Sequence, residues 1–161
     1  NVRTGIMTSQ LAVTTMLLLG LMFAGCRPAV GNPGEAAAIA AIQQLGGKVE
    51  VDDKQPDRPV LKVYLHSTPV TDADLAHLEQ LKRVQNLFLG KTQITDAGLE
   101  HLQGASNLKT LSLNATRVTD VGLKSLTGLT NLKTLNLQET KVTAGGVAEL
   151  KRKLPGVTIA R

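Results

Sequence analysis

The residues best suited to chemistry in this sequence are three histidines and one cysteine. His77 and His101 lie 24 residues apart, and Ser125 and Glu149 follow at the same spacing. Histidines stacked in this way can ligate a metal ion, but zinc sites usually hold four ligands. Since this column offers two histidines and no cysteine, we expect exposed side chains, with neither a metal site nor a cofactor.

No residue pattern typical of catalysis occurs in the chain. The nucleophile motif GxSxG, the zinc motif HExxH, the phosphate-binding P-loop and the redox motif CxxC are all absent. The acidic residues stand at the starts of expected helices and on convex faces, not in pairs that could act as acid and base in a cleft. We therefore do not expect an enzyme.

Cys26, the single cysteine, stands where a targeting signal would end. Residues 11–23 are apolar and uncharged, and Ala24 and Gly25 directly precede Cys26. Segment 1–25 resembles a bacterial lipoprotein signal, in which small residues precede a cysteine that becomes lipidated. Such a cysteine carries more than one acyl chain, as stable anchoring requires. We expect a cell-envelope protein that is anchored to the membrane through lipid on Cys26 and faces the periplasm or the exterior.

Two other interpretations of this segment stay open. It could be an uncleaved anchor, although its apolar run is shorter than the roughly 20 residues that a membrane-spanning helix needs. It could also be an ordinary secretory signal that leaves a free thiol. In all three cases, the rest of the chain lies outside the cytoplasm.

Charge and composition narrow the class of protein further. The formal net charge of +5 results from 18 basic and 13 acidic residues spread along the chain, a balance that argues against a nucleic-acid partner. Aromatic residues make up only 2% of the chain, with no tryptophan. A core of Leu, Val, Ile and Ala suits stacked layers of identical aliphatic side chains.

A repeat of 24 residues organises residues 60–153 into four copies. Each copy begins with an LxxLxL pattern and continues with TDxGLxxL, or a close variant of it. A period of this length with that opening is the signature of leucine-rich repeats. Aligned columns include Val63, Leu87, Leu111 and Leu135; Leu65, Leu89, Leu113 and Leu137; Thr68, Thr92, Thr116 and Thr140; and Val70, Ile94, Val118 and Val142.

Each repeat predicts a short parallel strand followed by a helix on the opposite side. Thr71, Thr95, Thr119 and Thr143 are expected helix N-caps, and Asp72, Asp96 and Asp120 follow in the first turn, where the helix dipole favours negative charge. Glycines at 98, 122 and 146 predict close approach between neighbouring helices. The threonine column that begins at Thr68 predicts buried hydroxyls that bond backbone groups of the turn and form a ladder between layers.

The segments outside the repeats are expected to form a linker and two caps. Residues 26–33 are expected to be the lipidated cysteine and a linker. Residues 34–59 predict a capping unit, with a helix over 35–45 and a strand over 48–51. Residues 154–161 predict a C-terminal cap strand, with Ile159 in the Val63 column.

Residues 60–161 resemble bacterial leucine-rich repeat proteins of the planctomycete type, in the ribonuclease-inhibitor-like group. The segments QNLFLGKTQITDAGLEHLQGASNL and KTLNLQETKVTAGGVAELKRKLP carry this resemblance. It implies a curved, right-handed α/β solenoid with parallel strands on the concave face, helices on the convex face, and a protein partner. Similar repeats of eukaryotic F-box proteins hold ubiquitylation substrates, but no F-box precedes these repeats.

Strand alternation predicts which side chains point outward on the concave face. Tyr64 and Phe88 fall on neighbouring strands, about 5 Å apart. Exposed aromatic residues are typical of binding hot spots. The alternative is that residues 48–59 cover both rings. The candidate ligand-binding residues on this face are Tyr64, His66, Phe88, Ser112, Asn114, Asn136 and Gln138.

Lys91, Arg117 and Lys141 stand near the ends of successive strands and form a modest basic edge. This edge could meet an acidic partner, but an ordinary solvated surface is the favoured explanation.

The sequence therefore predicts a membrane-anchored, extracytoplasmic protein that binds another protein through its concave strand face. A rigid row of outward side chains would lower the entropic cost of binding. The alternatives are a structural envelope lipoprotein without a specific ligand, and a substrate-adaptor-like module similar to the repeats of F-box proteins.

Overall fold

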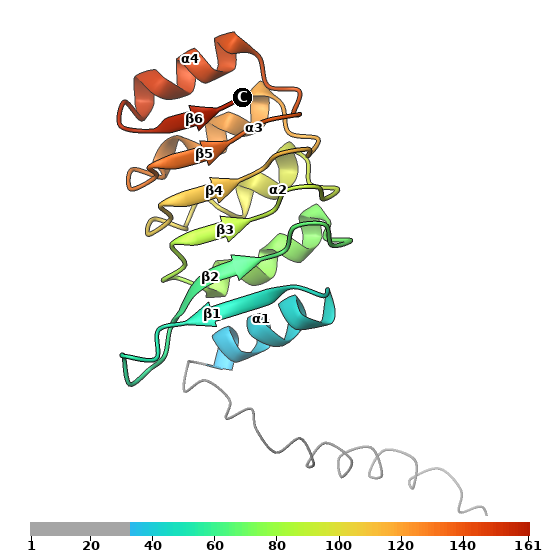
Figure 1. The fold of residues 1–161 in the computed structure, drawn as a ribbon, viewed down its shortest axis with the longest axis vertical. Helices are drawn as coiled ribbons and strands as arrows, with labels where there is room; N and C mark the ends of the chain where they lie inside the picture. Colours follow the sequence, from blue (N-terminus) through green and yellow to red (C-terminus); the bar gives the residue numbers. More distant parts are fainter. Residues whose placement is uncertain (1–32) are drawn as a thin grey trace, which may run out of the picture.

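The computed structural model describes residues 33–161, which form one sheet with helical segments packed along one of its faces (Figure 1). The sheet consists of β1 (Lys48–Val51), β2 (Val60–Tyr64), β3 (Asn86–Phe88), β4 (Thr110–Ser112), β5 (Thr134–Asn136) and β6 (Thr158–Ala160), in that spatial order. β1 runs antiparallel to β2, and the later pairs are parallel.

The helical layer follows the same order along the chain. It consists of α1 (Pro33–Gln44), η1 (Asp72–Gln80), α2 (Asp96–Glu100), α3 (Asp120–Leu123), η2 (Lys124–Gly128) and α4 (Ala144–Lys153). Strand, turn and helical segment recur once per repeat, which confirms the expected α/β solenoid.

The repeat length sets the register of the sheet. Leu87 pairs with Leu111, and Leu111 pairs with Leu135, so equivalent residues lie side by side. All three leucines are buried beneath the helical layer, at 0–1% exposure. Because side chains alternate along a strand, their neighbours point away from the helices. The period of 24 residues therefore fixes which side chains share a column on the sheet surface.

The helical segments differ from the uniform helices expected from the sequence. η1 is a 3-10 helix, and α3 continues as the 3-10 segment η2. Strands lie about 4.8 Å apart, whereas an α-helix with its side chains is about 10 Å wide. The tighter 3-10 turn relieves this mismatch, because it makes a slimmer segment.

The threonine hydroxyls bond backbone groups of the turn, as expected, but these bonds do not form the expected ladder between layers. The Thr92 hydroxyl donates to the Leu89 carbonyl of its own repeat at 2.7 Å, and Thr116 bonds Leu113 in the same way at 2.6 Å. The bonds between layers come from the backbone instead, as where Lys91 N donates to Asn114 O at 2.8 Å. Each hydroxyl thus closes the turn after its own strand, because that carbonyl lies only three residues away.

Aspartates join successive repeats at the starts of the helical segments. Asp96 accepts bonds from the backbone N–H and the hydroxyl of Thr119, at 2.7 and 2.6 Å. Asp72 and Asp120 bond Thr95 and Thr143 in the same way. The threonines also serve as N-caps of their own helices, since Thr95 and Thr119 accept a backbone N–H.

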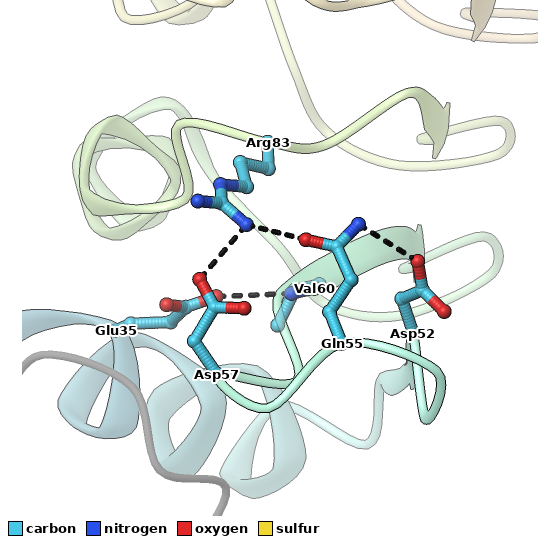
Figure 2. Close-up of polar contacts among 6 residues, drawn as sticks. All are labelled: Glu35, Asp52, Gln55, Asp57, Val60 and Arg83. Atoms are coloured by element: carbon cyan, nitrogen blue, oxygen red, sulfur yellow. Dashed lines mark hydrogen bonds and ion pairs between the residues drawn. The ribbon is translucent and has the colours of Figure 1, made fainter.

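The capping unit is tied to the first repeat through a polar loop (Figure 2). Arg83 forms an ion pair with Asp57 at 2.8 Å and donates to the Gln55 side-chain oxygen at 2.9 Å. The Glu35 carboxylate accepts a bond from Val60 N, which connects α1 to the start of β2. The loop over residues 52–59 is thereby held at the edge where the strands begin.

Candidate functional site

The sheet surface that faces away from the helices carries the candidate site, and we call it the open sheet face. Its residues are outward-pointing members of β1–β6, and none of them is buried. They are Lys48, Glu50, Lys62, Tyr64, Asn86, Phe88, Thr110, Ser112, Thr134, Asn136, Thr158 and Ala160.

Tyr64 and Phe88 stack on this face. Their ring centroids lie 5.0 Å apart and their planes differ by 5°. The two residues are direct partners of β2 and β3, so the spacing between strands sets the spacing between rings. Both side chains are half-buried. Neither ring is fully buried by residues 48–59. Glu50 of β1 contacts the Tyr64 hydroxyl, while Arg83 holds the loop after β1 at the strand edge.

Charged groups from β1 and β2 hold the Tyr64 ring in place. Its hydroxyl donates to the Glu50 carboxylate at 2.7 Å, and Lys62 forms an ion pair with the same carboxylate at 2.7 Å. Hydrogen bonds from Lys62 and Tyr64 lower the pKa of Glu50. The bond to Glu50 in turn raises the pKa of Lys62 and that of Tyr64. Tyr64 thus presents its ring with its hydroxyl already engaged.

The polar side chains of the later repeats extend the face from Phe88. The Ser112 hydroxyl donates to the Asn114 side-chain oxygen at 2.9 Å. The side-chain amide of Asn114 packs against Gly90. A Cβ atom added to Gly90 would collide with that amide. The Asn136 side-chain oxygen accepts the backbone N–H of Gln138 at 3.0 Å. Sequence reasoning placed these residues in columns but missed these bonds, because it could not assign rotamers.

The remaining candidate residues lie around this face. His66 and Gln138 are exposed in the turns after β2 and β5. Lys91, Arg117 and Lys141 are exposed at the edge where the strands end, and Lys91 has a positive φ of 58°. The basic edge stays a prediction, as does the binding role of the open sheet face.

The two histidines of the helical layer lie away from the open sheet face, and one of them contacts a carboxylate. His101 Nδ1 lies 2.6 Å from the Glu79 carboxylate, while His77 is exposed. A cavity of about 170 Å³ lies beside this pair, and its lining includes Lys82 and Glu100. Within residues 33–161, no group of three or more His, Cys, Asp or Glu side chains is placed to hold a metal ion.

Comparison with known proteins supports the repeat assignment. Residues 104–126 and 128–151 match the family model described as Leucine Rich repeat. These two segments are leucine-rich repeats by this match. These two matched segments contain β4 and β5, and the same strand–turn–helix unit recurs in the two repeats before them.

Several solved structures of bacterial proteins align with this chain. A leucine-rich repeat protein of Leptospira interrogans aligns with a TM-score of 0.53 at 18% identity, over 65% of this chain and 26% of its own. Internalin C2 of Listeria monocytogenes aligns with a TM-score of 0.47 at 26% identity, over 65% and 42% of the two chains. Internalin inlF of the same species gives 0.43 at 22%, over 62% and 34%.

The family match and the Leptospira interrogans alignment support the leucine-rich repeat fold and leave the activity open. The chain spans between about a quarter and two fifths of the length of the solved chains that it matches. The comparison with curated protein sequences returns no match.

The targeting prediction lies outside the described residues, since Cys26 precedes residue 33. In the part of the chain that the structure describes, no helix has the length and apolar character to cross a membrane.

Proposed function

We propose that this leucine-rich repeat solenoid binds a protein partner through the open sheet face, and that it is a binding module, not an enzyme. The observation that carries the proposal is the stacked, half-buried pair of Tyr64 and Phe88 on a face whose other side chains are mostly polar or charged. Aromatic residues supply much of the binding energy of protein interfaces.

The rigidity of this face supports the proposal. Tyr64 is fixed by its bond to Glu50 and by stacking against Phe88, while Ser112 and Asn136 engage local partners. Side chains that are ordered before binding lose less conformational entropy when a partner docks. A partner would therefore meet a surface whose shape is already set.

We also propose a cellular location for the protein. The repeats would stand outside the cytoplasm, anchored to a membrane by lipid on Cys26. This part rests on the apolar run and the Ala-Gly-Cys sequence. A Cys26→Ala variant of the full chain, expressed in a bacterial host with radiolabelled fatty acid, should lose both the label and the membrane association. Unchanged labelling or unchanged fractionation would contradict it.

The binding role is tested by crosslinking capture with the full chain. The wild type should capture a protein that the double variant Tyr64→Ala/Phe88→Ala does not, with circular dichroism confirming that both chains are folded. Val121→Ala is the matched control, because Val121 is a large apolar residue, 65% exposed, in the helical layer. Equal capture by the wild type and the double variant would favour a structural role, or a different face.

A further inference from the structure

The Tyr64–Phe88 stack is open toward β4. Tyr64 covers one face of the Phe88 ring at a centroid distance of 5.0 Å. The next residue in register is Ser112, which pairs with Phe88 across β3 and β4. Serine fills only a small part of the volume that an aromatic ring would take. One strand spacing beyond the Phe88 ring, the column therefore has room for a planar group that would stack as the third member.

The groups around this open position are polar and locally engaged. The Ser112 hydroxyl points to Asn114, which turns back over Gly90. Asn136, the next member of the column, uses its side-chain oxygen on Gln138 N, so its amide N–H groups have no partner among the described residues. A ring above Ser112 would thus contact Phe88 on one side and meet hydrogen-bond donors on the other.

Cations flank this position at both ends of the strands. Lys109 and Lys133 stand where β4 and β5 begin, while Arg117 and Lys141 stand in the turns that follow these strands. All four are exposed, and within residues 33–161 none of them has a carboxylate within 4.0 Å. Residues 86–94, 110–118 and 134–142 contain β3, β4 and β5 with the turns that follow them. Glu139 is the only acidic residue in these three segments.

The acidic residues of these repeats are used elsewhere. Asp96 and Asp120 bond the threonines of the following repeats, while Glu100 and Glu149 lie in the helical layer. In the helical layer of these repeats, four cations balance the four acidic residues: Lys124, Lys151, Arg152 and Lys153. The excess positive charge of these repeats therefore lies around the sheet face. Such a field attracts a negatively charged partner and speeds its association.

We propose that the partner is an acidic polypeptide segment that inserts one aromatic side chain above Ser112, against the free face of Phe88. This inference rests on the proposed function and adds the chemistry of the ligand. A nucleic acid is the other common polyanion with stacking rings. It would present a row of bases, whereas the column offers one open ring face and the net charge is only +5.

Selection of random peptides displayed on phage, with the full chain in mild detergent as bait, tests this inference. The enriched peptides should carry an excess of Asp and Glu together with one aromatic residue. Binding of the synthesised peptides should weaken when ionic strength is raised to about 0.5 M, because salt screens exposed charges. Enrichment of basic or non-aromatic peptides, or no enrichment over bare support, would overturn the proposal.

Two tyrosine variants test the stacking slot, one inside it and one in the helical layer. Ser112→Tyr should cover the free face of Phe88 with the protein's own ring and weaken peptide binding about tenfold, as expected for loss of a stacked pair. Val121→Tyr adds the same ring at an exposed position of α3, leaves the slot open, and should bind like the wild type. Equal affinity for Ser112→Tyr and wild type, or equally tight binding of an oligothymidylate, would overturn the proposal.

The same variants distinguish failure of this inference from failure of the proposed function. A protein captured by the wild type and by Ser112→Tyr, but lost with Tyr64→Ala/Phe88→Ala, would keep the open sheet face as the binding site. It would reject the aromatic slot above Ser112.

Discussion

The Asp96 carboxylate binds Thr119 of the following repeat twice, accepting its backbone N–H at 2.7 Å and its hydroxyl at 2.6 Å. This pair connects the helical segments of neighbouring repeats. An equivalent aspartate–threonine pair joins every repeat to the one that follows it. The two ends of the series depart from it in informative ways. Thr71 has no preceding repeat, and Asp74 of its own helix supplies both bonds. Ala144 replaces the aspartate in the last repeat, where no repeat follows within the described fold.

Removal of one member of this series should weaken the whole solenoid. Asp96→Ala deletes the acceptor of two bonds at a partly buried position, and we expect a loss of about 2 kcal/mol in the free energy of unfolding. Urea denaturation followed by circular dichroism measures it. Glu100→Ala, at an exposed position in the same short helix, should change stability by less than about 0.5 kcal/mol. Equal effects of the two substitutions would argue against a role for the pair.

Two adjacent glycines of α4 should respond in opposite directions to alanine. A Cβ at Gly146 would collide with the Asp120 side chain, so we expect Gly146→Ala to destabilise the protein by about 1–3 kcal/mol. At Gly145 the nearest atom is Thr143 Oγ1 at 3.4 Å, and Gly145→Ala should stabilise by about 0.5–1 kcal/mol through helix propensity. Thermal unfolding compares the two. A stabilising Gly146→Ala would mean that the aspartate contact is dispensable.

Acid should weaken the aspartate–threonine bonds selectively. The backbone N–H of Thr71 lowers the pKa of Asp74, and the hydroxyl of Thr143 lowers that of Asp120. Because the folded pKa lies below the unfolded value of about 3.9, each carboxylate stabilises the fold fully above about pH 5. This contribution is lost as pH falls through the lowered pKa.

Melting temperatures between neutral and acidic pH test this dependence. The difference between wild type and Asp74→Asn/Asp120→Asn should be largest at neutral pH and should shrink steadily as pH falls below about 4 and the carboxylates take up protons. A difference that stays constant with pH would show that the carboxylate charge contributes nothing.

Tyr64 offers a direct probe of the open sheet face, because it is the only tyrosine and the chain has no tryptophan. Its bond to Glu50 raises its pKa, so ultraviolet absorbance should show the tyrosinate forming above the ordinary value of about 10. Glu50→Gln should lower the midpoint. Lys62→Ala should raise it, since the charge of Lys62 favours the tyrosinate. A midpoint that neither variant moves would contradict the observed network.

Much of the fold follows from local pattern. The spacing of Leu87, Leu111 and Leu135 predicts stacked strands, because equal spacing along the chain becomes equal position in the sheet. It also predicts that Tyr64 and Phe88 are neighbours. The glycines at 98, 122 and 146 predict close approach, but the group that approaches is an aspartate carboxylate from the preceding repeat. Side-chain rotamers decide that contact, and the pattern does not contain them.

The sequence by itself determined the period, the inward columns, the N-cap threonines and the outward row from Tyr64 to Asn136. Each of these depends on spacing and on the alternation of a strand. Only the tertiary structure decided that Asp96 bonds the next repeat, that the Thr92 and Thr116 hydroxyls bond within their own repeats, and that Arg83 holds the capping loop at the strand edge. These contacts join residues whose side chains have several possible partners at similar distance. In the packed fold, each of these side chains has room to reach only one of its possible partners.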